Sequence, residues 1–501
     1  MLQKILTLFH RLLDSPKTFF VIVGLLIAQA LWFALTVQYP MAFDENYHLG
    51  IIQIYAQQWL PFIQSNPPGS EAYGDITRYG SYMFHYLMSF PYRLISLFTE
   101  NFYIQVIFLR FINIALFVGG LFAFRHVLRY MRISRKLTNF TLLLLVLIPV
   151  VPFLAATINY DNLILLIVPL FIWLVVKSDQ DIHKSTLSAR TLALLIALGC
   201  FGSLVKYAFL PIFGISIVYL VILWLRAKKR QQILSAIIAS LKHEKPWVQF
   251  ILALLTVISV GLFIERYGVN IVQYQKYEPT CSAVRPISEC VQYGPWGRDY
   301  RTQQTVQETN PPHNPAIPLF VPAWIDGLLY RLYFAINYDY SNKQPLPLPF
   351  FTAYIVGVIG LIAAFIYSRS IVRKNRYLLL LGIVIVTYGA SLFYVNFSSY
   401  VDLRTMVAIN GRYFLIIMPF IFIWLAYAYR HLFTSLFKRR ATSLLGILGI
   451  FVIIATLNGG GMITHLVRSE TSWFWQSGPE TTINTTAQDI VQPVIIDFKH
   501  R

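Results

Sequence analysis

The sequence predicts an all-α polytopic membrane protein. Of its 501 residues, 56% are hydrophobic and only 13% are charged, and the mean hydropathy is +0.58. A soluble globular domain carries roughly 25% charged residues. Apolar runs long enough to cross a bilayer as helices recur along the chain. We therefore expect the length to be used for membrane spans rather than for several soluble domains.

The apolar runs predict about eleven spans, each near the roughly 20 residues that a helix needs to cross a bilayer. They fall at residues 19–37, 103–124, 137–156, 160–177, 190–205, 207–225, 248–264, 352–368, 376–395, 412–429 and 441–457. The runs at 190–205 and 352–368 are the shortest. The first run follows Lys4, Arg11 and Lys17 and precedes no small-residue cleavage site, so we expect an uncleaved signal-anchor span.

Charge placement predicts how the chain is oriented. The net charge is +19, from 41 Lys and Arg against 22 Asp and Glu. With the N-terminus in the cytoplasm, the short basic loops all fall on the cytoplasmic side, as the positive-inside rule requires. These loops are residues 125–136, 178–189, 226–247, 369–375 and 430–440. This placement explains the positive charge without a nucleic-acid partner and predicts a multi-pass protein of the plasma (inner) membrane.

Two long loops are predicted on the extracytoplasmic side, at residues 38–102 and 265–351. Each contains an aromatic segment that is too short to span the bilayer, at 79–90 and 317–336. Trp and Tyr favour the membrane–water interface, so these segments are expected to form interfacial helices. The two loops are expected to roof a site on the membrane domain.

The three cysteines exclude a disulfide-dense or zinc-ribbon scaffold. Cys281 and Cys290 both fall in the second outer loop, where the predicted compartment is oxidising, so a disulfide is expected between them. Cys200 lies within a span and is expected to pack there as a small residue. We expect the membrane domain to cover residues 1–457 and an extracytoplasmic tail to cover residues 458–501.

Two adjacent carboxylates, Asp44 and Glu45, follow the first span directly. Like charges beside a low-dielectric layer are costly and usually have a counter-ion, a metal or a substrate. If a helix restarts after Pro40, Asp44 and His48 share one face and Glu45 points about 100° away. The alternative is that both acids are only solvated at the outer surface.

Further polar residues recur at the same predicted membrane level. Asp161 lies in the short outer connection after the third span, Lys206 in the next one, and Arg404 and Arg412 flank the start of the tenth. Cations suit a lipid phosphate, and a carboxylate can activate an acceptor hydroxyl or hold a metal. For Lys206 or Arg412 alone, snorkelling to the interface is the simpler interpretation. The set as a whole favours a site.

In their order, these features resemble the C-type (GT-C) superfamily of integral membrane glycosyltransferases, whose donors are sugars on dolichyl or undecaprenyl phosphate. There an acidic motif follows the first span, as Asp44-Glu45 does here, and a second acid often follows the third span, as Asp161 does. A poorly characterised bacterial branch provides the narrower resemblance. It rests on Phe43-Asp-Glu-x-x-His48, Asn159-Tyr-Asp161, Lys206 ahead of a proline, and Gly411-Arg-Tyr-Phe414.

The resemblance implies that a sugar moves from a polyprenyl-phosphate carrier to an extracytoplasmic acceptor, with inversion of the anomeric centre. Asp44 is then expected to accept the acceptor's proton, with Glu45 and Asp161 orienting the acceptor or a metal. The residues expected to bind the substrate or its phosphate are His48, Arg78, Lys206, Arg404, Arg412 and Tyr413. The candidate ligands of a divalent ion, Mg²⁺ or Mn²⁺, are Asp44, Asp161 and His48, and metal dependence stays open.

Two other functions fit parts of the sequence. A transporter or lipid flippase also has many spans and charged residues, but such proteins often show repeated halves and helices broken at mid-membrane. The sequence shows no internal repeat, and its charged cluster is predicted at the outer surface. A polymerase or ligase acting on an undecaprenyl-diphosphate glycan shares the predicted outer site, and only its donor separates it from the first interpretation.

Overall fold

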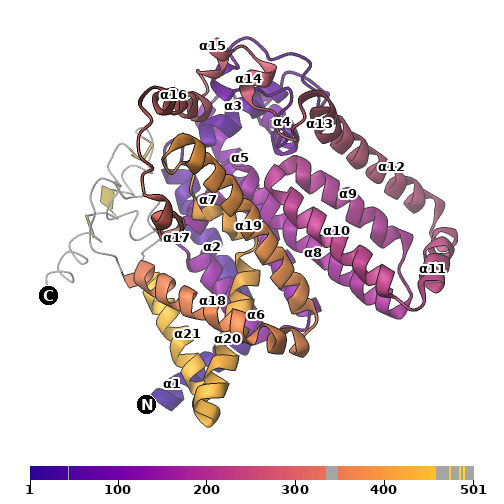
Figure 1. The fold of residues 1–501 in the computed structure, drawn as a ribbon, viewed down its shortest axis with the longest axis vertical. Coiled ribbons are helices and arrows are strands. Elements are labelled where there is room, and N and C mark those ends of the chain that lie inside the picture. The colour runs from indigo at the N-terminus through magenta and orange to yellow at the C-terminus, as the bar shows by residue number, and fades with distance from the viewer. Residues whose placement is uncertain (43, 334–347, 459–472, 476–484, 487–488, 491–501) are drawn as a thin grey trace.

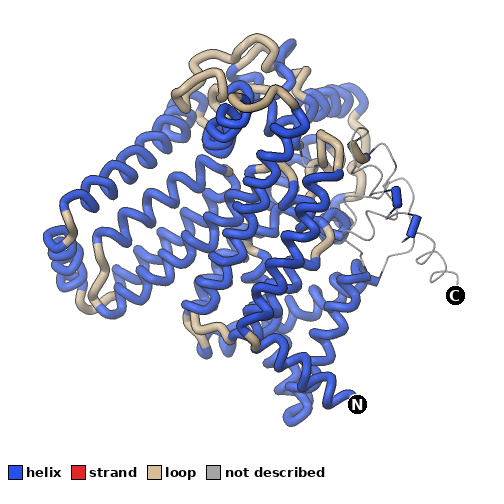
Figure 2. The backbone as a smooth tube through the Cα atoms, turned by 180° about the vertical axis from the view of Figure 1, so that it is seen from behind, coloured by secondary structure: helices blue, strands red, loops and turns tan. Residues whose placement is uncertain are grey.

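The computed structural model describes residues 1–42, 44–333, 348–458, 473–475, 485–486 and 489–490. Across these residues the chain is built from helices and contains no β-strand (Figures 1 and 2). The all-α prediction is therefore confirmed. An isolated antiparallel bridge joins Val37 to Phe474, which brings a short piece of the C-terminal tail to the end of the first long helix.

Eight helical stretches among the described residues are long and apolar enough to cross a membrane. They are α2 (Pro16–Thr36), α5 (Phe102–Tyr130), α8 (Tyr160–Lys184), α10 with the preceding turn (Tyr207–Arg226), α12 to α13 (Pro246–Tyr274), most of α18 (Phe351–Lys374), α19 (Tyr377–Leu403), and α20 to α21 (Met418–Leu457). A bilayer is therefore the natural environment of this chain.

The expected count of about eleven spans is not confirmed, because each of the eleven predicted runs is helical but not each run forms a separate long helix. The run at 137–156 is divided into α6 (Arg135–Leu147) and α7 (Val150–Ala156), which are bent by 76°. Pro149 lies at this break, where its ring and missing N–H interrupt a helix. The run at 190–205 forms α9 (Ala189–Val205), which has 17 residues.

The last of the eight apolar stretches consists of two helices, and the chain turns between them. α20 (Met418–Phe437) and α21 (Ala441–Asn458) are joined by a short 3-10 turn over Lys438–Arg440 and pack against each other. The turn begins with Lys438 at a positive φ of 42°. Within the described residues, length and composition allow eight spans, or nine if the bent pair of α6 and α7 forms one span.

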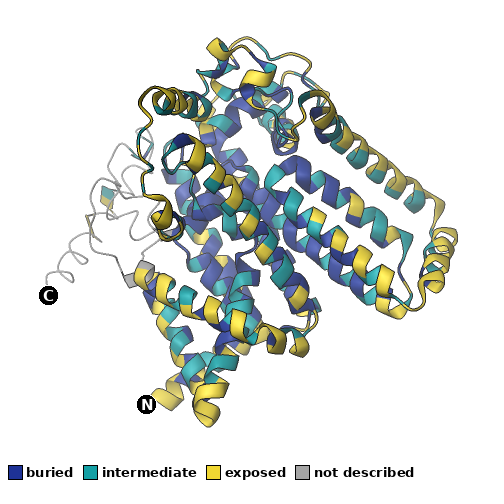
Figure 3. Ribbon diagram, viewed as in Figure 1, coloured by how far each residue is buried: buried dark blue, intermediate teal, exposed yellow. Residues whose placement is uncertain are grey.

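The centre of the bundle is formed by α5 and α8, which are the most buried long helices (Figure 3). Their backbones approach closely at Gly120, where an added Cβ would lie 3.0 Å from the carbonyl oxygen of Leu165. Small residues allow such close contact between membrane helices. By contrast, α12 (Pro246–Phe263) is exposed along its length and lies at the edge of the bundle. An apolar helix in this position faces lipid.

Most of the two long loops lies at one end of the bundle, away from the N-terminus (Figure 1). The first loop contains α3 (Glu45–Tyr55) and α4 (Met83–Ser96), and the latter overlaps the predicted segment 79–90. The second contains three short helices, α14 (Cys281–Val284), α15 (Ile287–Cys290) and α16 (Gly294–Thr309). It then forms α17 (Phe320–Tyr333) within the predicted segment 317–336, whose last three residues lie outside the described part of the chain.

A disulfide joins Cys281 to Cys290 and closes α14 and α15 into one small unit. Arg285 lies between the two cysteines and ties this unit to the first loop, because its Nη1 donates to the carbonyl oxygen of Gly74 at 2.7 Å and to the hydroxyl of Ser70 at 3.2 Å. These hydrogen bonds hold the second loop against the first. Cys200 is buried within α9 as a free thiol.

Candidate active site

Asp44 immediately precedes α3 and is the most exposed member of the predicted cluster. Its backbone is left-handed, with φ of 67°, which is uncommon for residues other than glycine and is best tolerated by Asn and Asp. Its carbonyl oxygen accepts from the N–H of His48, so Asp44 still starts the helix. Its side chain is 60% exposed, and one oxygen, Oδ2, accepts from Nη2 of Arg412 at 2.9 Å. Unusual backbone of this kind often marks a functional position.

Arg412 reaches Asp44 from the other end of the sequence. It lies in a 3-10 turn, Gly411–Ile416, in which the Asn410 side chain accepts from the N–H of Arg412 at 3.0 Å. Gly411 is required here, because an added Cβ would lie 2.1 Å from the carbonyl oxygen of Leu328 in α17. The guanidinium is only 6% exposed, and its Nε lies 3.9 Å from Oδ2 of Asp161.

Asp161 and Lys206 complete a chain of alternating charges. Asp161 begins the first turn of α8, where its N–H donates to the Asn159 side chain at 2.8 Å. Lys206 directly follows α9 and forms a buried ion pair with the other oxygen of Asp161, Oδ1. The order Asp44–Arg412–Asp161–Lys206 balances two negative charges with two positive ones, which limits the cost of burying them.

Aromatic rings lie close to both cations in this row of alternating charges. The Lys206 ammonium lies 4.6 Å from the ring centre of Tyr160 and 4.9 Å from that of Tyr413. The Arg412 guanidinium lies 5.5 Å from the ring centre of Tyr413. Desolvated cations gain about 2 kcal/mol from such contacts. Tyr413, predicted as a substrate-binding residue, therefore contacts two of the predicted phosphate-binding cations, Lys206 and Arg412.

Glu45 points away from this cluster, as the helical geometry predicted, and into the core. It is fully buried and pairs in a fork with Arg110 of α5, at 2.9 Å (Oε1 to Nε) and 2.7 Å (Oε2 to Nη2). Its oxygens also accept from the N–H of Met41 and of Ile158. Glu45 thus ties the start of α3 to α5 and to the turn before Asp161.

His48 also points inward, and its Nδ1 lies 2.9 Å from Nε2 of His85 on α4. Both rings are buried, and burial lowers the pKa of His85 to about 3 and the pKa of His48 well below its ordinary value. Two neighbouring neutral rings can share one hydrogen bond. The side chains of His48 and Asp44 therefore contact different partners.

The predicted metal ligands do not fit a shared ion in this arrangement. Arg412 lies between the carboxylates of Asp44 and Asp161, and His48 faces His85. Within the described residues, no three side chains of His, Cys, Asp or Glu form a group that could hold an ion. We therefore derive no step through a metal.

Two of the predicted phosphate-binding residues have partners elsewhere. Arg78 forms an ion pair with Glu265, which lies just after the end of α12. Arg404 ends α19, where its guanidinium contacts the Asn310 side chain at 3.0 Å and the ring of His313 at 3.4 Å. Both arginines fasten the second loop to its surroundings, and neither contact involves Asp44 or Asp161.

Arg110 and Asn113 were not predicted as site residues, although both support the site. Arg110 is a lone arginine inside an apolar run, and such a charge implies a buried partner. Asn113 lies one turn further along α5, and its side-chain oxygen accepts from the N–H of Asn159 at 3.2 Å and from Asn162 at 3.0 Å. These bonds fix the turn that presents Asp161.

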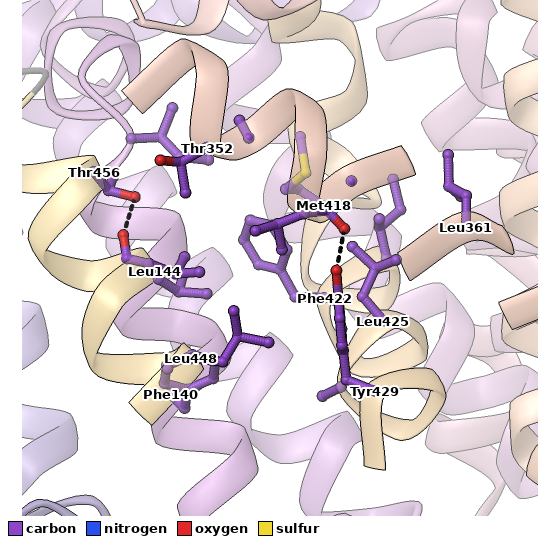
Figure 4. A pocket seen from close by; sticks show the side chains of 18 of the residues that line it. Phe140, Leu144, Thr352, Leu361, Met418, Phe422, Leu425, Tyr429, Leu448 and Thr456 are labelled. Carbon is purple, nitrogen blue, oxygen red and sulfur yellow. Dashed lines mark hydrogen bonds between the residues drawn. The ribbon is translucent and has the colours of Figure 1, made fainter. Parts of the chain in front are cut away.

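An apolar cavity of about 270 Å³ lies between α6, α17, α18, α20 and α21 (Figure 4). Its wall is formed almost wholly by aliphatic and aromatic side chains, among them Leu144, Leu332, Met418 and Phe422. Leu332 is also a neighbour of Gly411, because an added Cβ there would lie 2.6 Å from its Cγ. The residue next to Arg412 therefore adjoins the cavity wall.

Comparisons with known proteins do not assign a function to this chain, so the function is inferred from the geometry of the site. No known protein family matches this chain, and no curated protein matches it either.

Proposed function

We propose that this protein is a membrane glycosyltransferase that moves a sugar from a polyprenyl-phosphate carrier to an extracytoplasmic acceptor. The observation that carries the proposal is the position of Asp44: an exposed carboxylate with left-handed backbone, held through one oxygen by Arg412. A general base needs a fixed orientation and an oxygen that a substrate can reach. The plasma membrane, with the site on its outer side, is part of this proposal.

In the proposed reaction, an acceptor hydroxyl attacks the anomeric carbon of the donor and gives its proton to Asp44. The new bond joins the acceptor oxygen to the anomeric carbon. The bond from that carbon to the phosphate oxygen breaks, and polyprenyl phosphate leaves with the electron pair. A direct displacement of this kind inverts the anomeric centre.

Lys206 and Arg412 are the cations nearest to Asp44 and Asp161, and we assign the donor phosphate to them. The phosphate gains negative charge as it leaves, and cations fixed in a water-poor site stabilise such charge strongly. Asp161 orients both cations through its two oxygens. Glu45 acts as a positioning residue through Arg110.

The apolar cavity supports a lipid-linked donor. Its lining suits a hydrocarbon chain, and one of its lining residues, Leu332, adjoins Gly411 beside Arg412. Burial of each methylene group contributes about 0.8 kcal/mol.

The test is release of polyprenyl phosphate by the purified protein in lipid nanodiscs. The donors are polyprenyl-phosphate mannose, glucose and arabinose, and a membrane extract supplies the acceptor. We expect release by the wild type and none by Asp44→Asn. If neither protein releases lipid phosphate from any of the three donors while both remain folded, the proposal is overturned. Release from a diphosphate-linked glycan in a parallel assay would then identify the polymerase or ligase reaction.

A further inference from the structure

A group of tyrosines next to Asp44 is not used in the reaction described above. Tyr47 lies three residues after Asp44 on α3, and its ring centre is 5.7 Å from Tyr293 and 6.1 Å from Tyr73. It also hydrogen-bonds to Tyr79, whose ring centre is 6.4 Å away. Tyr47, Tyr79 and Tyr293 each keep partly exposed side chains. Part of the surface of each of these three tyrosines is therefore accessible.

Tyr293 connects this group to the ion-pair cluster. Burial, and then the charge of Asp44, raise the pKa of Tyr293 to about 12, and Tyr413 acts on it in the same direction. Tyr293 is thus close to both the proposed base, Asp44, and Tyr413. The Lys206 ammonium lies 4.9 Å from the ring centre of Tyr413.

Glu278 adds a carboxyl group to the wall that Tyr47, Tyr79 and Tyr293 form. Its Oε1 accepts from the N–H of Gly80 at 3.4 Å, and its Oε2 is buried without a hydrogen-bond partner among the described residues. Burial raises the pKa of Glu278 to about 8, so the carboxyl is largely protonated at pH 7. A protonated carboxyl offers one O–H donor as well as an acceptor.

Two glycines of the first loop allow this wall to form. An added Cβ at Gly80 would lie 2.5 Å from Oε2 of Glu278, and one at Gly74 would lie 2.9 Å from the ring of Tyr293. Gly74 also has a positive φ of 72°. Tyr293 and Glu278, both from the second loop, therefore lie directly on the backbone of the first loop. The wall exists only when the two loops are closed together.

We propose that Tyr47, Tyr79, Tyr293 and Glu278 bind the sugar ring of the lipid-linked donor. This inference rests on the proposed function and assigns its specificity-determining residues. A sugar ring has apolar C–H faces and a rim of hydroxyl groups. Tyrosine rings cover the former, while the phenol groups and Glu278 hydrogen-bond the latter. The donor sugar is favoured over the acceptor because the wall continues through Tyr413 to Lys206 and Arg412.

The experiment compares lipids with and without a sugar. Nanodiscs containing the protein are titrated with decaprenyl phosphate and with decaprenyl-phosphate mannose, glucose and arabinose, and affinities are measured by microscale thermophoresis. We expect at least one glycosylated lipid to bind the wild type at least 10-fold more tightly than the bare lipid. Tyr293→Ala and Glu278→Ala should remove that difference and change the affinity for the bare lipid by less than twofold.

Controls separate folding, the sugar site and the proposed function. Glu278→Gln keeps the shape of the side chain and should retain most of the preference. Tyr394→Ala removes a tyrosine that is 72% exposed on α19 and should change nothing. The sugar site is overturned if the wild type binds bare and glycosylated lipids equally, or if Tyr293→Ala keeps the preference. Failure to bind any of the four lipids overturns the proposed function itself.

Discussion

The guanidinium of Arg412 joins two carboxylates that are far apart in the sequence: its Nη2 lies 2.9 Å from Oδ2 of Asp44, 368 residues away, and its Nε lies 3.9 Å from Oδ2 of Asp161. This one side chain connects the start of α3 with the start of α8. It fixes the orientation of the exposed Asp44 carboxylate, on which the proposed reaction depends.

Asp44→Asn should abolish sugar transfer while the protein remains folded. Removal of a general base typically costs 10²- to 10⁴-fold in rate. Because the side chain is 60% exposed, its neutral isostere should change the melting temperature little. The measurement is release of polyprenyl phosphate per minute, with Asp402→Asn, an exposed aspartate on α19, as the matched control. Wild-type rates in Asp44→Asn would remove Asp44 from the chemistry.

Glu45→Gln and Arg110→Met should each destabilise the protein. Breaking one side of a fully buried ion pair leaves an uncompensated charge and typically costs about 3–5 kcal/mol. The double variant should lose less than the sum of the single variants, because it leaves no unpaired charge. Thermal unfolding in detergent, followed by tryptophan fluorescence, measures all four corners of the cycle. Additive losses would show that the two side chains do not act as a pair.

Lys206→Met should be tolerated only when Asp161 is also neutralised. The single variant removes the shorter ion pair of the buried Asp161 and leaves it only the 3.9 Å contact with Arg412, whereas Asp161→Leu with Lys206→Met removes both charges. We expect the double variant to fold and to bind decaprenyl phosphate at least 10-fold more weakly than the wild type. Equal affinity in the folded double variant would show that Lys206 does not bind the phosphate.

The His48–His85 pair predicts a loss of stability in mild acid. Burial lowers the pKa of His85 from 6.5 in the unfolded chain to about 3, so the folded state binds fewer protons between these values. The free energy of unfolding should therefore fall as the pH decreases below 6.5, by up to about 2 kcal/mol at pH 5. His85→Gln should flatten this part of the melting-temperature profile, whereas the exposed His243→Gln should follow the wild type.

The double variant Cys281→Ser and Cys290→Ser should loosen the second loop. A disulfide that closes a loop of this length contributes about 2–3 kcal/mol, mainly by restricting the unfolded chain. The melting temperature should decrease, and a reducing agent should lower that of the wild type to the same value. Limited proteolysis should cut within residues 276–293 of the double variant first. Identical proteolysis of both proteins would mean that Arg285 alone fastens the loop.

Much of the architecture could be predicted because each apolar run carries its own signal. A helix in a bilayer satisfies its backbone internally, so composition over 20 residues decides the element. The break at Pro149 could also be found locally, whereas its 76° bend depends on packing. Asp44, Asp161, Lys206 and Arg412 could be grouped from their predicted membrane level, and the structure brings these four together.

Partner choice could not be predicted, because it depends on contacts between distant segments. Glu45 stood beside Asp44 in the sequence, yet its side chain faces Arg110 in the core. Arg78 and Arg404 shared the predicted outer side with Arg412, yet they bind parts of the second loop. Membrane level alone does not distinguish these arginines.

The sequence by itself determined that this protein is helical and built for a membrane, since hydrophobicity and backbone hydrogen bonding act within each segment. It also supplied an acidic pair, a buried lysine and a Gly-Arg-Tyr turn. Only the tertiary structure decided that Arg412 joins Asp44 to Asp161, and that Tyr293 and Glu278 close beside them. The physical reason is that a charge buried at low dielectric needs an oppositely charged partner, and helix packing decides which one is within reach.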